Sequence, residues 1–175
     1  MHAVPITDMK TPLGSAAQVG ILVPDLEAGL DWYGRMFGIE EWLCYHYTQE
    51  FFPWSEYRQS PGEFEMKLAM SADSGPQVEL IQPLAGPSIY HEFTSAGRWG
   101  LHHLGVFVDD LDRAVSQMEA AGYGVTQSAR GYGQSSDGGF AYFDTEERLQ
   151  IVIEAIEVPT VRRPGVVRRT GEGVK

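Results

Sequence analysis

One pair of polar side chains occupies the same place in two similar segments of the chain. The segment AAQVGILVPDL, residues 16–26, aligns with LHHLGVFVDDL, residues 101–111, so that Gln18 falls opposite His103. Both segments alternate between apolar and other residues as strands do, and each reaches an aspartate that can cap a helix. Amide oxygens and imidazole nitrogens are both ligands for divalent cations. The pair therefore has the chemistry of a metal site.

A second pair, both glutamates, occurs at matching places further along each half. The segment QVELIQP, residues 77–83, aligns with VIEAIEVP, residues 152–159, so that Glu79 falls opposite Glu154. Alternate residues of a strand share a face, which places each glutamate on the face away from its apolar neighbours. A buried carboxylate needs a partner. If the sheets curve together, all four side chains line one cavity, and a divalent cation is the simplest partner for them.

The elements that position these side chains are also duplicated. The amphipathic segment LEAGLDWYGRMFG follows Asp25 and ends at Gly38, whereas LDRAVSQMEAAG follows Asp110 and ends at Gly122, so each half begins with a strand and a helix. The predicted organisation is an N-terminal extension (1–14), a first module (15–84), a linker with a short helix near Ser88–Ser95 (85–98), a second module (99–159) and a basic C-terminal tail (160–175).

Two parts of the chain have no counterpart in the duplication. Residues 44–64, CYHYTQEFFPWSEYRQSPGEF, lengthen the first module and predict an aromatic-rich loop or irregular strand, whose rings either close the core or cover a substrate. The basic tail, with Pro164 and few large apolar residues, is expected to run over the surface or to be disordered. Strand alternation further predicts that His102 points away from His103.

Composition limits the partners and the compartment. The chain has 175 residues, 43% of them hydrophobic, and a net charge of -11, which disfavours nucleic acid and anionic membrane surfaces as partners. No apolar segment approaches the roughly 20 residues needed to cross a bilayer, and no signal-peptide pattern is present, so a cytoplasmic protein is expected. The single cysteine, Cys44, excludes an intramolecular disulfide and a multi-cysteine zinc site.

The duplicated segments resemble the vicinal oxygen chelate superfamily, which includes glyoxalase I, methylmalonyl-CoA epimerase and the extradiol dioxygenases. The resemblance covers residues 16–159 and implies an α+β fold, in which two paired βαβββ modules form a cupped, mostly antiparallel sheet around a metal site. It also implies a homodimer. The family takes its metal ligands from the first and last strands of each module, which in this chain gives Gln18, Glu79, His103 and Glu154.

The resemblance points to two members of the family. The ligand set of one glutamine, one histidine and two glutamates is similar to one form of the glyoxalase I site. The segment VELIQPL, followed by a short helix and GLHHLGVFVDDLD, is closer to methylmalonyl-CoA epimerase. Some epimerases use a further glutamate as a base, and by resemblance the segment GEFEMKLAM, residues 62–70, places Glu65 in that role.

The ligand set favours proton transfer beside a carbonyl group. Two carboxylates neutralise a divalent ion such as zinc, nickel, cobalt or manganese, and four protein ligands leave two octahedral positions for adjacent substrate oxygens. Such an ion stabilises an enolate, while Glu154 or Glu79 carries the proton. The main hypothesis is a metal-dependent isomerase or epimerase that acts on a small-molecule carbonyl substrate.

Three alternatives remain open. A glyoxalase I-type lyase would act on a thiol adduct with the same ligands. An extradiol dioxygenase is disfavoured, because Gln18 breaks the usual set of two histidines and one carboxylate, and Glu79 would take a position that the substrate and dioxygen need. A metal-free small-molecule binding protein is disfavoured because it has no need of four ligand-type residues.

Overall fold

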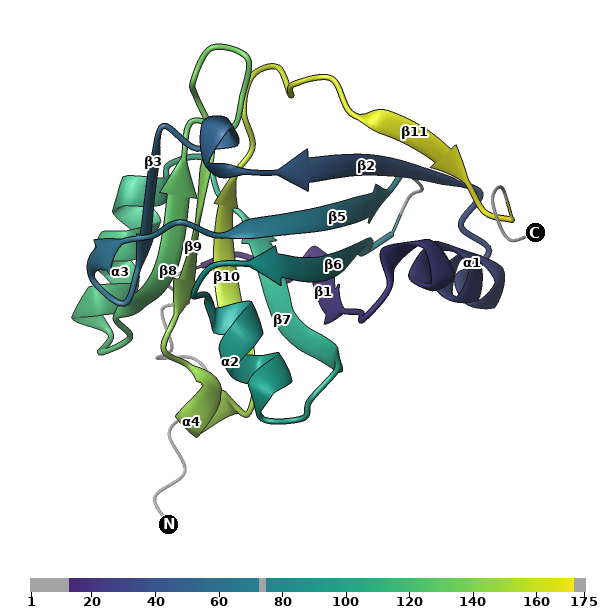
Figure 1. The fold of residues 1–175 in the computed structure, drawn as a ribbon. Coiled ribbons are helices and arrows are strands. Elements are labelled where there is room, and N and C mark those ends of the chain that lie inside the picture. The colour runs from purple at the N-terminus through teal and green to yellow at the C-terminus, as the bar shows by residue number, and fades with distance from the viewer. Residues whose placement is uncertain (1–12, 73–74, 172–175) are drawn as a thin grey trace.

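The chain folds around one continuous sheet. The structure is a computed structural model and describes residues 13–72 and 75–171. The first half contains β1 (Gln18–Leu22), α1 (Leu26–Phe37), β2 (Glu41–Tyr47), β5 (Glu65–Ser71) and β6 (Gln77–Ala85). The second half contains β7 (Gly100–Phe107), α3 (Leu111–Ala120), β8 (Val125–Arg130), β9 (Gly139–Phe143) and β10 (Val152–Glu157). Each half is therefore a βαβββ unit, and the α+β class is as predicted (Figure 1).

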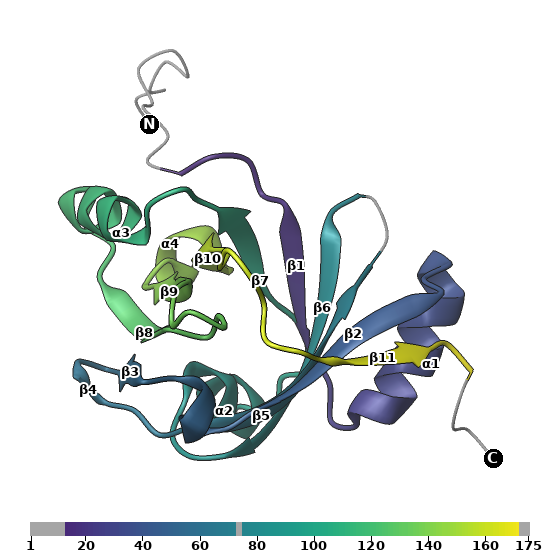
Figure 2. The same ribbon diagram turned by 90° about the horizontal axis from the view of Figure 1, so that it is seen from above.

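The two halves join through their first strands. The strand order is β11-β2-β5-β6-β1-β7-β10-β9-β8-β3-β4, and the join is the antiparallel pair β1–β7. Figure 2 shows these two strands side by side between the two halves of the curved sheet. Only β1–β6 and β7–β10 pair in parallel among the described strands, so the sheet is mostly antiparallel, as predicted.

The helices cover the outer face of the sheet. Asp25 caps α1 by accepting a hydrogen bond from the Ala28 amide, and Asp110 caps α3 by accepting one from the Arg113 amide. Helix α1 packs on Ile21 and Leu80 of β1 and β6, whereas α3 packs on β9 and β10. The opposite, concave face is therefore left free for a separate core, rich in aromatic and methionine side chains, which fills the cup.

The short connecting elements complete the fold. Helix α2 (Ile89–Ser95), capped by Ser88, is the helix predicted between the halves. Helix α4 (Glu146–Leu149) precedes β10, and a 3-10 turn, η2 (Gln49–Phe51), follows β2. Within the described residues, no helix has both the length and the apolar character needed to cross a bilayer.

The aromatic-rich region 44–64 bridges the two halves. It contains the end of β2, η2, and the hairpin of β3 (Trp54–Tyr57) and β4 (Ser60–Pro61). Strand β3 leaves its own half and pairs with β8, so that Ser55 lies opposite Ala129. The predicted irregular region is thus partly a regular strand, because the second half offers it an open edge.

The C-terminal tail is more regular than its composition predicts. Residues Val166–Arg169 form β11, which pairs antiparallel with β2 of the first half. Thr170 then accepts a hydrogen bond from Nε1 of the fully buried Trp42, at 3.1 Å. The tail runs over the surface as an edge strand, because β2 presents unpaired backbone groups at the sheet edge. The final residues, 172–175, lie outside the described residues.

His102 does not point away from His103. The register between β1 and β7 shifts at Gly20/Ile21, so that Gly20 pairs with His103 and Ile21 pairs with Leu101. His102 is the extra residue of this β-bulge, which interrupts strict alternation. Both histidines are buried, and their Nδ1 atoms lie 3.0 Å apart.

Candidate metal centre

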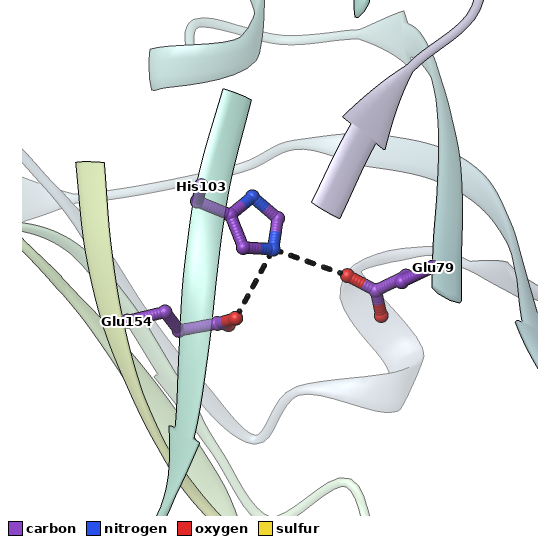
Figure 3. A group of neighbouring side chains, drawn as sticks. All are labelled: Glu79, His103 and Glu154. Atoms are coloured by element: carbon purple, nitrogen blue, oxygen red, sulfur yellow. Dashed lines mark ion pairs between the residues drawn. The ribbon is translucent and has the colours of Figure 1, made fainter. Parts of the chain in front are cut away.

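Three of the four predicted ligands meet at the bottom of the cup. Ligand atoms of Glu79, His103 and Glu154 all lie within 4.8 Å of one another. Nε2 of His103 lies 3.4 Å from Oε2 of Glu79 and 3.3 Å from Oε2 of Glu154. Figure 3 shows the imidazole between the two carboxylates, which approach it from different strands. All three side chains are buried.

The strand register explains this convergence. In one row across the sheet, Gly20 of β1 lies between Glu79 of β6 and His103 of β7. A Cβ atom on Gly20 would lie 1.9 Å from Cε1 of His103, so the imidazole occupies the space that a side chain at position 20 would fill. The glycine lets the ligands of two strands reach the same point.

The neighbouring row repeats the arrangement with the halves exchanged. Gly105 of β7 lies between Gln18 of β1 and Glu154 of β10. A Cβ atom on Gly105 would lie 2.8 Å from Oε1 of Gln18. Gln18 is buried and lines the same small cavity as Glu79 and Glu154. The structure therefore brings Gln18, Glu79 and Glu154 to one cavity, and His103 lies against the two carboxylates.

The unsatisfied polar atoms of the protein concentrate at this point. The described residues contain five buried side-chain atoms without a hydrogen-bond partner, and three of them are Gln18 Oε1, His103 Nε2 and Glu154 Oε2. The Gln18 amide is fixed from its other end, because its Nε2 donates to Oε1 of Gln77 at 2.9 Å. Unpartnered buried polar groups are costly unless an ion or water satisfies them.

The spacing and chemistry of these atoms fit a divalent cation. Ligand atoms bound to one ion at about 2.0–2.2 Å lie roughly 3–3.5 Å apart. The distances of 3.3 and 3.4 Å from Nε2 of His103 fall in that range. Two carboxylates, one imidazole and one amide oxygen form a mixed nitrogen and oxygen set that suits zinc, nickel, cobalt or manganese. Gln18, Glu79, His103 and Glu154 are the residues that would hold the ion.

The electrostatics show how strongly the pocket attracts positive charge. Burial opposes the charged form of His103, but the carboxylates of Glu154 and Glu79 outweigh it and raise the pKa of the imidazole to about 9. Burial raises the pKa of Glu154 as well, against the opposing effect of the His103 charge. Metal ligands must be deprotonated, so a bound cation would take the place of the His103 proton.

His102 contacts the ring of His103 at the nitrogen that faces away from the carboxylates. If Nε2 of His103 binds a cation, the ring proton must sit on Nδ1, from which it is donated to Nδ1 of His102 at 3.0 Å. Burial, together with the charge of His103, lowers the pKa of His102 to about 2, which keeps it neutral and able to accept. The rings of Tyr90 and Phe93 pack against His102 and hold it in place.

Glu65 does not reach the site. Its Oε1 lies 2.6 Å from Nε2 of His46 in an ion pair whose two side chains are 38% and 50% exposed. Met66, Leu68 and Met70 of the same strand line the cavity instead. The position of Glu65 therefore does not support the expectation that it acts as a base, because Glu65 pairs with His46 and does not line the cavity.

The remaining lining comes from residues that the duplication does not reveal. Tyr47, Tyr132 and Tyr142 line the cavity, and so does Arg162 of the C-terminal tail. Tyr47 belongs to the aromatic-rich segment that was one candidate for a substrate cover. The sequence around Arg162 does not predict that this residue lines the cavity, because its position depends on the path of the tail back to β2.

Comparisons with solved structures support the fold. Methylmalonyl-CoA epimerase from Mycobacterium tuberculosis superposes with a TM-score of 0.60 at 20% identity, covering 86% of this chain and 93% of that chain. A Streptomyces coelicolor methylmalonyl-CoA epimerase variant in complex with 2-nitronate-propionyl-CoA gives 0.59 at 16% identity, covering 87% and 99%. A hypothetical protein from Bacillus halodurans C-125 gives 0.62 at 14% identity, covering 85% and 97%.

Sequence comparisons give the family. No curated protein sequence matches this chain significantly. The family model described as the glyoxalase/bleomycin resistance protein/dioxygenase superfamily matches residues 17–143, which is more than half of the chain. This match agrees with the paired βαβββ units and with the convergence of Glu79, His103 and Glu154 from β6, β7 and β10. The chain therefore belongs to the glyoxalase/bleomycin resistance protein/dioxygenase superfamily, the vicinal oxygen chelate proteins.

Proposed function

We propose that this protein is a divalent-metal-dependent isomerase or epimerase that moves a proton on the carbon beside a carbonyl group. The observation that carries the proposal is the convergence of Glu79, His103 and Glu154 within 4.8 Å, with the free Gln18 oxygen in the same cavity. When bound, a divalent cation would polarise the substrate carbonyl and stabilise the enolate charge. The protein's own residues must then move the proton.

Glu79 and Glu154 are the residues suited to that task. They are the carboxylates that line the cavity within the described chain, and they approach Nε2 of His103 from different directions (Figure 3). One carboxylate takes the proton from the carbon and leaves the C–H electron pair in the enolate. The second carboxylate, on the other side, returns a proton to the opposite face. That arrangement supports inversion at the carbon as well as simple exchange.

A glyoxalase I-type lyase is the second candidate. The specific observation in its favour is Gln18, whose unpartnered Oε1 completes the glutamine, histidine and two-glutamate set that resembles that enzyme. The reaction would use the same two carboxylates to move a proton between adjacent carbons of a thiol adduct. Product analysis separates it from epimerisation, because the lyase converts an aldehyde adduct into a hydroxyacyl thioester.

Two measurements on the purified protein test the proposal. Elemental analysis by mass spectrometry should find about one divalent ion per chain in the wild type and much less in Glu154→Gln. Nuclear magnetic resonance in deuterated water should then show exchange at the carbon beside the carbonyl for a member of a panel of acyl thioesters, oxo acids and hydroxyketones. Glu65→Gln is the matched control, since Glu65 faces outward.

The outcomes are decisive in both directions. Metal binding and exchange that are lost in Glu154→Gln and kept in Glu65→Gln support the assignment. A wild-type protein without metal, or one that exchanges no member of the panel, contradicts it.

We also propose that the protein is a homodimer. Light scattering coupled to size-exclusion chromatography measures the oligomeric state directly.

A further inference from the structure

The segment that joins β10 to β11 crosses the mouth of the cup, and we call residues 159–164 the strap. It is fastened to the loop between β8 and β9, where Gly133 and Arg162 form a β-bridge and the Gln134 amide donates to the Val161 carbonyl at 2.9 Å. On the other side, the hydroxyl of Tyr45 donates to the Arg163 carbonyl at 3.1 Å. The strap therefore ties the second half to the first, and its Arg162 lines the cavity that also contains Glu79 and Glu154.

Arg163 helps to hold the strap in place. Its guanidinium donates to the carbonyls of Gly133 at 3.2 Å, Gly131 at 3.4 Å and Glu50 at 3.4 Å. The two arginines of β11 are also engaged, since Arg168 pairs with Glu27 and Arg169 pairs with Glu41. These three tail arginines therefore have structural partners that account for them.

Arg162 differs from them. Its side chain lines the same cavity as Gln18, Glu79 and Glu154, and its guanidinium carbon lies 5.8 Å from the centre of the Tyr132 ring. Within residues 13–72 and 75–171, its guanidinium has no carboxylate within 4.0 Å and no hydrogen-bond partner. A half-buried cation over a ligand cavity thus lacks a counterion.

A neutral donor lies in the same wall. Tyr47 is buried and lines the cavity, and its hydroxyl has no hydrogen-bond partner in the described part of the chain. Burial raises the pKa of Tyr47, against a smaller opposing effect of the Arg162 charge. The phenol therefore stays protonated and able to donate. A guanidinium and a free hydroxyl facing one cavity form a pair of donors suited to an anionic group.

The charge balance of the cavity also favours an anionic ligand. The two carboxylates of the metal centre neutralise one divalent cation, which leaves the charge of Arg162 uncompensated. A guanidinium binds a carboxylate through two parallel hydrogen bonds, stronger than those to neutral groups. A substrate with a carboxylate near its carbonyl would place the carbonyl at the metal centre and the carboxylate at Arg162.

We infer that Arg162 is a substrate-binding residue for a carboxylate, and that the substrates are small carbonyl compounds that carry an acidic group. The inference rests on the proposed function for the identity of the carbonyl, but the carboxylate site has its own test. The cavity measures about 30 Å³, room for little more than a water molecule, so it must enlarge to admit a substrate.

Direct binding tests the inference without turnover. Isothermal titration calorimetry should show that the metal-loaded protein binds malonate, a small dicarboxylate, and that Arg162→Gln binds it roughly ten- to hundredfold more weakly, as expected for loss of a charged hydrogen-bond pair. Arg162→Lys should recover part of the affinity, because it keeps the charge without the planar fork. Malonamide, which has no charge, should bind the wild type and Arg162→Gln equally.

Two controls separate this inference from the proposed function. Arg168→Gln, which changes an arginine paired with Glu27 away from the cavity, should bind malonate as the wild type does. Metal content should be the same in Arg162→Gln and the wild type, which separates carboxylate binding from metal binding. Equal malonate affinity in the wild type and Arg162→Gln, or no malonate binding at all, overturns the inference. Failure of the proposed function appears separately, as missing metal or missing proton exchange.

Discussion

The Nδ1 atoms of His102 and His103 lie 3.0 Å apart, although the two residues are neighbours on one strand. The β-bulge opposite Gly20 makes this contact possible, because it interrupts the strict alternation of side chains along β7. A histidine ligand needs its second nitrogen fixed by a hydrogen-bond partner. Here that partner is the preceding residue in the sequence.

Removing this partner should weaken the metal centre without removing a ligand. We expect His102→Leu to bind a divalent ion roughly 10–100-fold more weakly than the wild type, as for other losses of a partner that orients a histidine ligand. His102→Gln keeps a side-chain acceptor and should lose less. Competition with a chelating dye measures both affinities. Equal affinity in His102→Leu and the wild type would show that His103 is oriented by something else.

Substitution of Gly20, the glycine opposite His103, should also weaken the metal centre. A Cβ atom at position 20 would lie 1.9 Å from Cε1 of His103, so Gly20→Ala must displace the imidazole or the strand. We expect a loss of about 1–3 kcal/mol in the free energy of unfolding, together with loss of bound metal. Urea denaturation and elemental analysis measure the two effects. Gly124→Ala, at an exposed position with open space, should change neither.

The pKa of Cys44, the single thiol, tests how deeply β2 is buried in the first half of the sheet. Burial, followed by the nearby charge of Glu27, raises the pKa of Cys44 from 9.0 to about 11. The protonated thiol is favoured in the folded state, so its contribution to stability is complete below pH 9 and is lost as the pH rises through about 11.

Alkylation kinetics check this directly. The rate with iodoacetamide follows the thiolate, so its midpoint should lie near pH 11 in the native protein and near pH 9 in denaturant. A native midpoint near 9 would mean that Cys44 is open to solvent on β2. The comparison needs no metal or substrate.

The tail should contribute measurable stability through one hydroxyl. Thr170 Oγ1 accepts from Nε1 of Trp42 at 3.1 Å and donates to the Ile39 carbonyl. Thr170→Val keeps the shape but leaves both groups unpaired, so we expect a loss of about 1–3 kcal/mol in the free energy of unfolding. Denaturation followed by tryptophan fluorescence measures the loss. Thr160→Val, at an exposed position, is the control, and equal losses in both variants would contradict a specific role for β11.

The sequence predicts the features that repeat and fails on those that depend on distant pairing. Gln18, Glu79, His103 and Glu154 could be found because alternation and duplication are local patterns, readable along each strand. The orientation of His102 could not, because the bulge exists only once β1 and β7 are aligned. A register shift between β5 and β6 lies at Glu65/Met66, and the side of the sheet that Glu65 occupies could not be read from the strand alone.

The tail shows the same limit at longer range. Its composition is that of a surface segment, yet β11 completes the edge beside β2, and the strap carries Arg162 to the cavity. Neither result follows from residues 160–171 by themselves, because both depend on where β2 and the loop 131–138 lie. The position of β3 beside β8 is a further case, since its pairing partner belongs to the other half.

The two glycine rows have a consequence for how such a chain can change over time. Gly20 is inherited with one copy of the duplicated unit but makes room for His103 of the other, and Gly105 does the same in reverse for Gln18. A substitution at one of these glycines in one copy would therefore disturb a side chain of the other copy. In homologues, substitutions at position 18 should therefore accompany substitutions at position 105, and those at position 20 should accompany those at position 103. If the two halves were encoded by separate genes that evolve independently, this covariation would be the first to disappear.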